Sequence, residues 1–439
     1  MTETATPMMD RVADVITGVS GEPHRTHAGV HVADAMIALL AGHASVEGKQ
    51  IAAMLARIDP SPLGTIAVHA SVMRLTEIDD IHRPTAVTPS AIVVPAALGI
   101  MAYTGATQPT VFADAIVAGQ EAAIGLATAL GGAHLLAKGL WPSYVVAPFA
   151  AAAAAGRMLE LPASRMRHAL ALALAQTPGA IGRSTGSRPG RWVLFGNAVR
   201  SGCVAAMAAA DGIDGDPDLL SETWLRTLGG NNANPAALTS HAAPPVIRQL
   251  SIKPHSSAKQ VLTALHGLQQ LIARGISPTD ITRIRIDVPT AYAQMINREP
   301  AWNSRLASLV SAPGQLALAA LAPAALDDVS RDTLVWTDEL MALAKRIEVH
   351  ADPTLDPLYP FHWPANVTIN VGSTQHRIDV RDSPGDPALA FHAGEVHDKA
   401  RRLLGRHPAL DLVAAGLRAP FEVDALEALG VRLRTMAMH

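Results

Sequence analysis

Cysteine is nearly absent from this 439-residue chain, and its scarcity excludes a disulfide-stabilised scaffold. The single thiol, Cys203, lies in an apolar, alanine-rich segment, which predicts a buried inert side chain rather than a nucleophile. No cluster of cysteine and histidine has the spacing of zinc ligands, and no G-x-G-x-x-G follows an expected strand. The sequence therefore predicts neither a bound metal nor an organic cofactor.

Charge is also scarce, which limits the partners. Charged residues make up 17% of the chain and the net charge is −3, so nothing attracts nucleic acid or an anionic membrane electrostatically. The N-terminus is acidic and lacks the basic region and apolar core of a signal peptide. The alanine-rich stretches are interrupted before they reach the roughly 18–20 apolar residues of a spanning helix. We therefore expect a cytoplasmic protein that binds neither nucleic acid nor membrane.

Against this background, residues 74–90 (RLTEIDDIHRPTAVTPS) form a polar cluster between two apolar helical stretches. The segment contains three acids, one histidine and two arginines. In a chain with so few charges, such a concentration indicates a functional site. Taken alone, the segment is also compatible with an acidic helix end followed by a proline-containing loop.

Two textures along the chain predict its architecture. Residues 1–256 have apolar positions at helical spacing and abundant alanine, which is typical of a bundle with closely packed helices. Between 257 and 390, some segments instead alternate apolar and polar residues as half-buried strands do; these are residues 281–292, 346–352 and 365–382. The last segment has Gly-Ser at its centre, which predicts a hairpin.

Helical patterns intervene at residues 258–274 and 314–321, and they return from about residue 391. The length also suggests two domains. We therefore predict a mainly α protein. Its large all-helical domain is expected from residues 1–256 and 391–439, and its smaller α+β domain from residues 257–390.

Segments throughout the chain resemble, in order, the motifs of the MmgE/PrpD family. The acidic cluster resembles the family signature H-x-x-D-x-D-D-x-H, with TPS at the position of the H-P-S that follows it. The other matching segments are HVADAMIALLAG (31–42), IVAGQEAAI (116–124), KGLWPSYVVAPFAAAAAAGRML (138–159), SIKPHSSAK (251–259) and VRDSPGDPALAFHAGEVHDKAR (380–401). The resemblance covers nearly the whole chain.

This resemblance implies a homodimer, in which a helical domain from both chain ends is interrupted by an α+β domain. It also implies cofactor-free chemistry that begins by removing a proton next to a carboxylate of a small di- or tricarboxylate. The outcome differs among members: dehydration by 2-methylcitrate dehydratase, decarboxylation by cis-aconitate decarboxylase, and epimerisation by iminodisuccinate epimerase. Each reaction needs a base, cations that stabilise the developing charge, and an acid.

Candidates for these roles lie at motif positions. Lys253 matches the family lysine and is a candidate base, acid or carboxylate-binding cation. Glu77 stands where the family has aspartate, and His82 ends the acidic motif. Tyr144 is a candidate base if a cationic neighbour lowers its pKa. The candidate substrate-binding residues are Arg74, Asp80, Thr88, Arg188, Arg191 and His255. The competing structural interpretations are a surface lysine, a helix-capping histidine and a packing tyrosine.

Departures from the family pattern favour one reaction. Several family histidines are missing, and so are a family lysine, an arginine and a tyrosine. The residues that stand at these positions are Arg74, Thr88, Gly125, Trp141, Arg191, Leu194 and Gly314. Since arginine binds carboxylates but seldom transfers protons, we expect epimerase chemistry, with Tyr144 and Lys253 as bases on opposite faces of the substrate.

Two alternatives stay open. One is a lyase that uses Lys253, His82 and His255, and the other is a catalytically degenerate scaffold that binds a carboxylate. In the enzymatic interpretation, we expect residues 77–82, Tyr144, Arg191 and Lys253 to line a cleft between the two domains.

Overall fold

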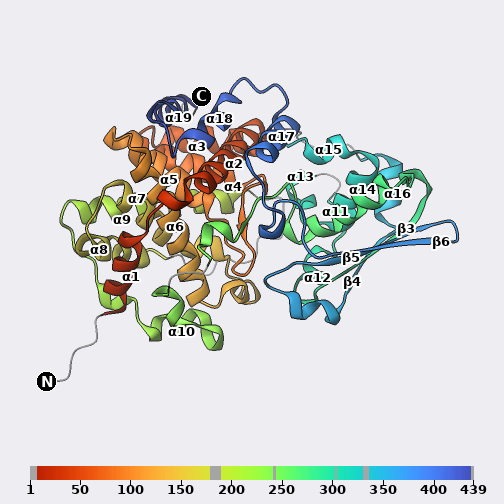
Figure 1. Cartoon of the computed structure of the whole chain (residues 1–439), viewed down its shortest axis with the longest axis horizontal. Coiled ribbons are helices and arrows are strands. Elements are labelled where there is room, and N and C mark those ends of the chain that lie inside the picture. Colours follow the sequence, from red (N-terminus) through yellow and green to blue (C-terminus); the bar gives the residue numbers. More distant parts are fainter. Residues whose placement is uncertain (1–6, 178–188, 241–243, 302–303, 330–335, 437–439) are drawn as a thin grey trace.

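The computed structural model describes residues 7–177, 189–240, 244–301, 304–329 and 336–436. It shows a mainly α protein with a small α+β part, which confirms the predicted fold class. Figure 1 shows the larger helical part beside the smaller part that holds the main sheet.

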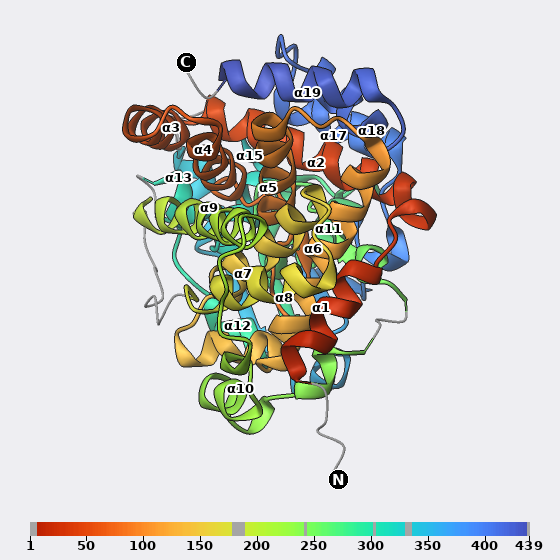
Figure 2. The same cartoon turned by 90° about the vertical axis from the view of Figure 1, so that its left-hand side faces the viewer.

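The helical part is built from both ends of the chain. Its N-terminal helices are α1 (Met8–Gly18), α2 (Arg25–Ala44), α3 (Val46–Ile58), α4 (Pro62–Arg74), α5 (Ser90–Thr104), α6 (Pro109–Ala129), α7 (Pro142–Met158), α8 (Ala163–Leu174), α9 (Gly190–Ala210) and α10 (Glu222–Gly229). The C-terminal helices are α17 (Ala393–Leu404), α18 (Asp411–Arg418) and α19 (Val423–Met436). Helices α17 and α18 pack on α2, and α19 packs on α5 (Figure 2).

Small residues let the central helices approach one another closely. A Cβ atom on Gly119 of α6 would lie 2.6 Å from the Val93 side chain of α5 and 2.9 Å from the Cβ of Ala154 in α7. The side chains of residues 149–155 in α7 are all buried. The alanine bias of the sequence thus produces a tightly packed helical core.

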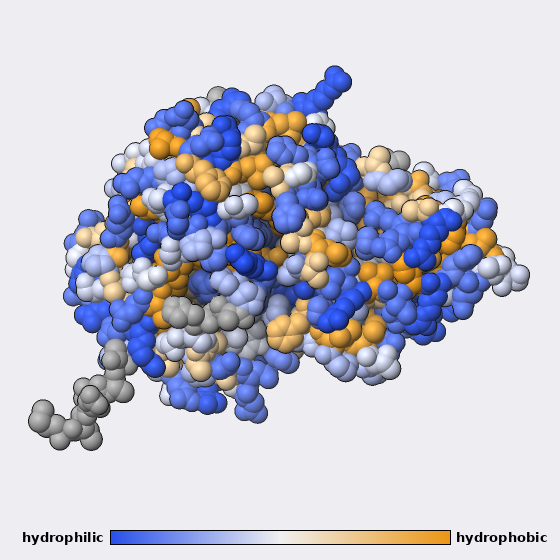
Figure 3. All heavy atoms as spheres, in the orientation of Figure 1, coloured by the Kyte–Doolittle hydropathy of each residue, from blue (hydrophilic) through white to orange (hydrophobic). Residues whose placement is uncertain are grey.

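We expected no helix long and apolar enough to span a membrane, and the length and composition of two helices contradict this expectation. Among the described residues, α6 and α9 are both long and apolar enough by length and composition alone. Within the protein, 72% of the apolar window of α6 and 50% of that of α9 are buried. Packing against neighbouring helices therefore uses much of this apolar surface. The face in Figure 3 shows mostly hydrophilic side chains with smaller apolar areas between them.

The α+β part contains a four-stranded sheet in the order β4-β3-β5-β6. Its strands are β3 (Ile281–Val288), β4 (Ile347–Ala351), β5 (Ala365–Val371) and β6 (Thr374–Val380). Its helices are α11 (Lys259–Ala273), α12 (Thr290–Ile296), α13 (Arg305–Ser308), α14 (Ala312–Leu321), α15 (Pro323–Asp327) and α16 (Asp338–Ala344). Strands β3 and β4 are parallel, and β5 and β6 form the predicted hairpin with Val371 opposite Thr374. The strand expected over residues 281–292 ends at Val288, because a proline and then α12 follow it.

Two hydrophobic cores occupy the two parts. The first joins helices from both chain ends and also takes in Leu306, Leu309 and Val329. The second fills the space between the sheet and its helices, and it includes Ile81 from the acidic motif. A two-stranded ladder lies between the parts, formed by β1 (Ile81–His82) and β2 (Leu250–Ser251).

Candidate active site

The ladder of β1 and β2 joins two motifs that are far apart in sequence. Ile81 lies opposite Ser251, and His82 lies opposite Leu250, in antiparallel register. Helix α4 ends at Arg74, so the acidic motif turns directly from a helix end into β1. The ladder therefore brings Lys253 against Glu77, although 176 residues separate them.

Five side chains form a charged cluster at this point: Arg74, Glu77, Asp79, Arg191 and Lys253. The Glu77 carboxylate lies at its centre, with Oε1 2.9 Å from Arg74 Nη1 and 3.9 Å from Arg191 Nη2. Lys253 Nζ lies 3.3 Å from Glu77 Oε2 and 3.4 Å from Asp79 Oδ1. Among these five side chains, the cations therefore outnumber the carboxylates by one.

The cluster is closed on one side and partly open on the other. The side chains of Lys253 and Asp79 are only 1% and 2% exposed, whereas Glu77 and Arg191 are 15% and 25% exposed. A ligand that approaches from solvent would therefore reach Glu77 and Arg191 first.

Burial and charge act oppositely on the two carboxyl groups. Burial alone would raise the pKa of Glu77, but the charges of Arg74, Lys253 and Arg191 hold that pKa at about 2. Burial raises the pKa of Asp79 despite the nearby Arg74 and Lys253. Glu77 is therefore the firmly ionised member, and protonation of Asp79 would increase the positive excess.

Glu77 also has an unusual backbone. Its φ of 57° lies in the left-handed region, which a side chain with a Cβ rarely adopts. Such a conformation persists only where surrounding contacts hold it, and it is frequent at functional sites. The turn that presents this carboxylate is therefore held in place by its neighbours.

Aromatic side chains form a wall beside the cations. The guanidinium carbons of Arg74 and Arg191 lie 5.3 and 5.6 Å from the Trp141 ring centroid, within cation–π range. Tyr144 stacks on Trp141 with centroids 6.3 Å apart, and Phe195 packs on Trp141 at 5.4 Å. This wall holds the guanidinium groups that face Glu77.

The two halves of the chain match two family models. The MmgE/PrpD N-terminal domain matches residues 3–230, and the MmgE/PrpD C-terminal domain matches residues 255–414. The chain belongs to the MmgE/PrpD family. Membership supports an enzyme of the dehydratase, lyase or isomerase type. A search of curated proteins returns no match.

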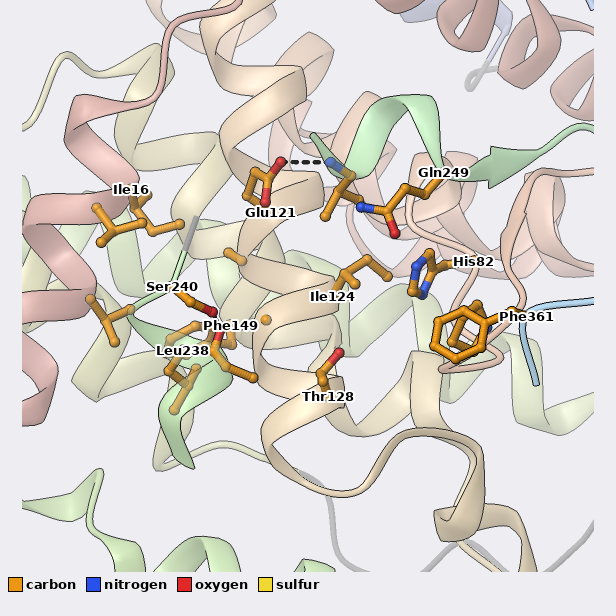
Figure 4. A pocket seen from close by; sticks show the side chains of 17 residues that line it. Ile16, His82, Glu121, Ile124, Thr128, Phe149, Leu238, Ser240, Gln249 and Phe361 are labelled. Carbon is orange, nitrogen blue, oxygen red and sulfur yellow. Dashed lines mark hydrogen bonds between the residues drawn. The ribbon is translucent and has the colours of Figure 1, made fainter. Parts of the chain in front are cut away.

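His82, at the end of the MmgE/PrpD acidic motif, is turned away from the charged cluster. Its Nδ1 atom lies 2.9 Å from Thr85 Oγ1, and its ring lines a separate pocket of about 240 Å³. Figure 4 shows His82 near Gln249 and Phe361 at one end of this pocket. Glu77, Arg191 and Lys253 are not among the described residues that line it. Burial lowers the pKa of His82 to about 4, so its ring is neutral at pH 7.

His255 also leaves the cluster, although only Pro254 separates it from Lys253. Its Nδ1 atom lies 2.7 Å from Asp327 Oδ1, and Arg402 Nε lies 2.9 Å from the other oxygen of that carboxylate. These contacts connect α15 with α17 and therefore give His255 a structural role in the described part of the chain.

Tyr144 belongs to the aromatic wall beside the charged cluster, but its pKa shift is opposite to the one that the base hypothesis needs. The hypothesis required a cation to lower the phenol pKa, whereas desolvation raises the pKa of Tyr144. The sequence offered two cations that could act on it, Arg191 and Lys253. Arg191 lies over the rings of Trp141 and Trp192, and Lys253 contacts Glu77 and Asp79. The phenol is thus a neutral proton donor at pH 7.

Two proposed substrate-binding residues make internal contacts instead. Thr88 Oγ1 is buried 3.1 Å from Ser143 Oγ. Asp80 accepts hydrogen bonds from the backbone and hydroxyl of Ser90, and its Oδ2 lies 2.9 Å from His31 Nδ1. Both contacts fix the start of α5 beneath the acidic motif. Arg188 lies outside the described residues.

Motif reasoning missed two members of the site. Asp79 was within the acidic motif, but its role as the second carboxylate beside Lys253 depends on β1 meeting β2. Trp141 stands where the family has histidine, and that departure was the signal that could have found it. Among the described residues, no group of three or more His, Cys, Asp and Glu side chains is placed to hold a metal ion.

Proposed function

We propose that this enzyme removes a proton next to a carboxylate of a small di- or tricarboxylate and returns it on the opposite face, as an epimerase does. The observation that carries the proposal is the charged cluster, whose cations outnumber its carboxylates around the partly open Glu77. A substrate carboxylate would neutralise the remaining positive charge. Arginine is well suited to this contact because its planar group binds carboxylates through two hydrogen bonds.

Arg191 is the proposed carboxylate-binding residue. A quarter of its side chain is exposed, and its Nη2 atom lies 3.9 Å from the Glu77 carboxylate. Once a substrate carboxylate shares the cations with Glu77, each cation stabilises the Glu77 charge less. The pKa of Glu77 then rises toward the range in which a carboxylate is an effective base.

Proton removal is assigned to Glu77 assisted by Lys253. The C–H electron pair moves into the substrate carboxylate and generates an enediolate, whose added charge Lys253 stabilises. Tyr144 donates its phenolic proton to the opposite face of the carbon. Water then restores the Tyr144 proton and takes the proton from Glu77. This assignment makes Tyr144 the acid, not the second base expected from the sequence.

The lyase alternative receives less support. Loss of water requires an acid beside the leaving group. Besides Lys253, which assists Glu77 in proton removal, the residues that the lyase hypothesis named were His82 and His255. The side chain of His82 faces the other pocket, and that of His255 binds Asp327. An epimerase needs no leaving-group acid, so the charged cluster with Tyr144 suffices.

Proton NMR in deuterated water tests the proposal. The enzyme is incubated with a panel of chiral di- and tricarboxylates, including amino- and imino-substituted ones. Deuterium at the α-carbon with scrambled configuration is the expected result. A new vinyl signal would replace the epimerase by a lyase. The absence of exchange and of product across the panel would support the carboxylate-binding scaffold.

The homodimer implied by the family and the cytoplasmic location expected from the sequence are also proposals. Exposed apolar side chains on α9, Leu194 and Val204, support a subunit contact there. Light scattering on the purified chain tests this, and a monomer at micromolar concentration would count against it.

A further inference from the structure

Asp34 and Lys399 come from opposite ends of the chain and meet beneath the acidic motif. Lys399 Nζ lies 2.5 Å from Asp34 Oδ1, across 365 residues of sequence. Both side chains are buried, with 0% and 1% exposure for Lys399 and Asp34. Asp34 lies in the early motif HVADAMIALLAG, and Lys399 lies in the late segment 380–401. The reaction described above uses neither residue.

Lys399 makes a second contact that reaches the site. Its Nζ donates a hydrogen bond of 2.7 Å to the backbone carbonyl of Ile78. Ile78 lies between Glu77 and Asp79, the two carboxylates of the charged cluster. The ammonium group thus holds the peptide that connects them, next to the residue whose φ is 57°.

This arrangement is costly, which indicates a role beyond joining α17 to α2. A buried ion pair is often no more stabilising than apolar residues of the same volume. Here burial raises the pKa of Asp34 to about 6 and lowers the pKa of Lys399, so each charge persists mainly through its partner. Lys399 also interacts electrostatically with Lys253 and Asp79.

We propose that Asp34 and Lys399 are a positioning pair. Asp34 orients the Lys399 ammonium, which donates its hydrogen bond to the Ile78 carbonyl. This hydrogen bond holds Glu77 in its left-handed conformation against Lys253. The proposal rests on the proposed function, because it assigns the pair to placing that base. Without this hydrogen bond, the turn at Glu77 relaxes and its carboxylate moves from its position between the cations. A displacement of about 1 Å in a reacting group reduces the rate by about 10²-fold.

Double variants that remove both charges distinguish this positioning role from a purely structural contact between helices. Asp34→Asn/Lys399→Met leaves no unpaired buried charge, so the fold is retained, but it removes the donor to Ile78. Asp34→Asn alone keeps that donor. Asp34→Asn/Lys399→Gln keeps an amide donor near the carbonyl without a charge, and it also serves if the methionine variant does not fold.

The matched control is the pair of Asp114 in α6 and Arg157 in α7. Arg157 likewise binds a carboxylate, at 2.8 Å, and a backbone carbonyl, that of Thr17, at 2.6 Å. Neither residue belongs to the charged cluster. Asp114→Asn/Arg157→Met therefore reports the effect of losing a similar bridge elsewhere in the helical part.

Two measurements decide the outcome: kcat and KM for α-deuterium exchange, and amide hydrogen exchange of residues 76–82 by mass spectrometry. We expect Asp34→Asn/Lys399→Met to lower kcat about 10²-fold, with KM within about threefold, and to speed amide exchange in residues 76–82 but not throughout α2. Asp34→Asn and the control should keep kcat within about tenfold of wild type, and the glutamine variant should regain at least about tenfold of the lost kcat.

A methionine double variant with kcat within about threefold of wild type and unchanged amide exchange in residues 76–82 would overturn the proposal. Faster amide exchange over the whole helical part would also overturn it, because that result indicates a purely structural contact between helices. If the wild type exchanges no α-proton of any carboxylate, the proposed function fails. The amide exchange of residues 76–82 then still decides whether the pair holds the turn.

Discussion

Replacing Lys253 with methionine should remove most of the activity while the protein stays folded. The lysine is 1% exposed, and its ammonium contacts Glu77 and Asp79 at 3.3 and 3.4 Å. Methionine has nearly the same length and no charge. After the change, Arg74 and Arg191 still face two carboxylates, so no buried charge is left uncompensated. We therefore expect a stability loss of about 2 kcal/mol, typical of hydrogen bonds to charged groups, rather than the roughly 3–5 kcal/mol of a broken buried pair.

The rate should fall much further, by about 10²–10⁴-fold, because Lys253 both assists Glu77 and stabilises the enediolate. The assay is α-deuterium exchange followed by NMR at saturating substrate, normalised to the folded fraction from urea unfolding. Lys259→Met is the control, since Lys259 is also buried but donates to Ser383 Oγ at 2.7 Å and pairs with Asp386. It should lose stability yet keep exchange within about threefold. A folded Lys253→Met protein within threefold of wild type would refute the reasoning.

Arg191→Met should raise KM about 10–100-fold with kcat within about fivefold, since it removes a charge-assisted contact of about 1.5–3 kcal/mol to substrate; a fall in kcat alone, measured by initial rates, would contradict this. Burial lowers the pKa of His69 from 6.5 to about 3, so the stability linked to its neutral form is complete above pH 6.5 and is lost as the pH falls toward 3. Wild type should therefore lose about 2 kcal/mol more than His69→Leu between pH 7 and pH 5 in urea unfolding, and equal losses would contradict the assignment. Exhaustive treatment with a chelator should leave turnover unchanged, and recovery of lost activity with a divalent ion would show that the reaction needs a metal.

The sequence predicted the fold class because burying one face of a helix or strand requires apolar residues at a regular spacing. The alternating segments became β3, β4 and the hairpin of β5 and β6, and the alanine-rich segments became closely packed helices. Motif order also placed Lys253 and the acidic motif in one site. The proline after Val288 was visible in the sequence, yet the alternation beyond it was wrongly continued as strand.

Side-chain direction at the site could not be predicted in the same way. Successive residues of a strand point to opposite faces, so once Ile81 enters the core of the α+β part, His82 turns toward the other pocket. The face that each residue takes depends on the pairing of β1 with β2, which involves residues about 170 positions apart. Motif matching reports identity and spacing only, and therefore included His82 in the catalytic set.

The pKa of Tyr144 shows a second limit. Whether a phenol is a base or an acid depends on the charges around it in space, and the sequence showed only that Arg191 and Lys253 were available. In the structure, Arg191 faces Glu77 and the indole rings, and desolvation is what acts on Tyr144. Trp141 at a family histidine position contributes to this arrangement, because its ring contacts both the Tyr144 ring and the two guanidinium groups.

A crystal structure of the protein with an unreactive carboxylate such as tartrate or citrate tests most directly whether the charged cluster is the active site. We expect one ligand carboxylate within about 3 Å of the Arg191 guanidinium, with the neighbouring carbon between Glu77 and Tyr144. A ligand held instead in the pocket beside His82, with Arg191 and Lys253 untouched, would contradict the claim that the charged cluster is the active site.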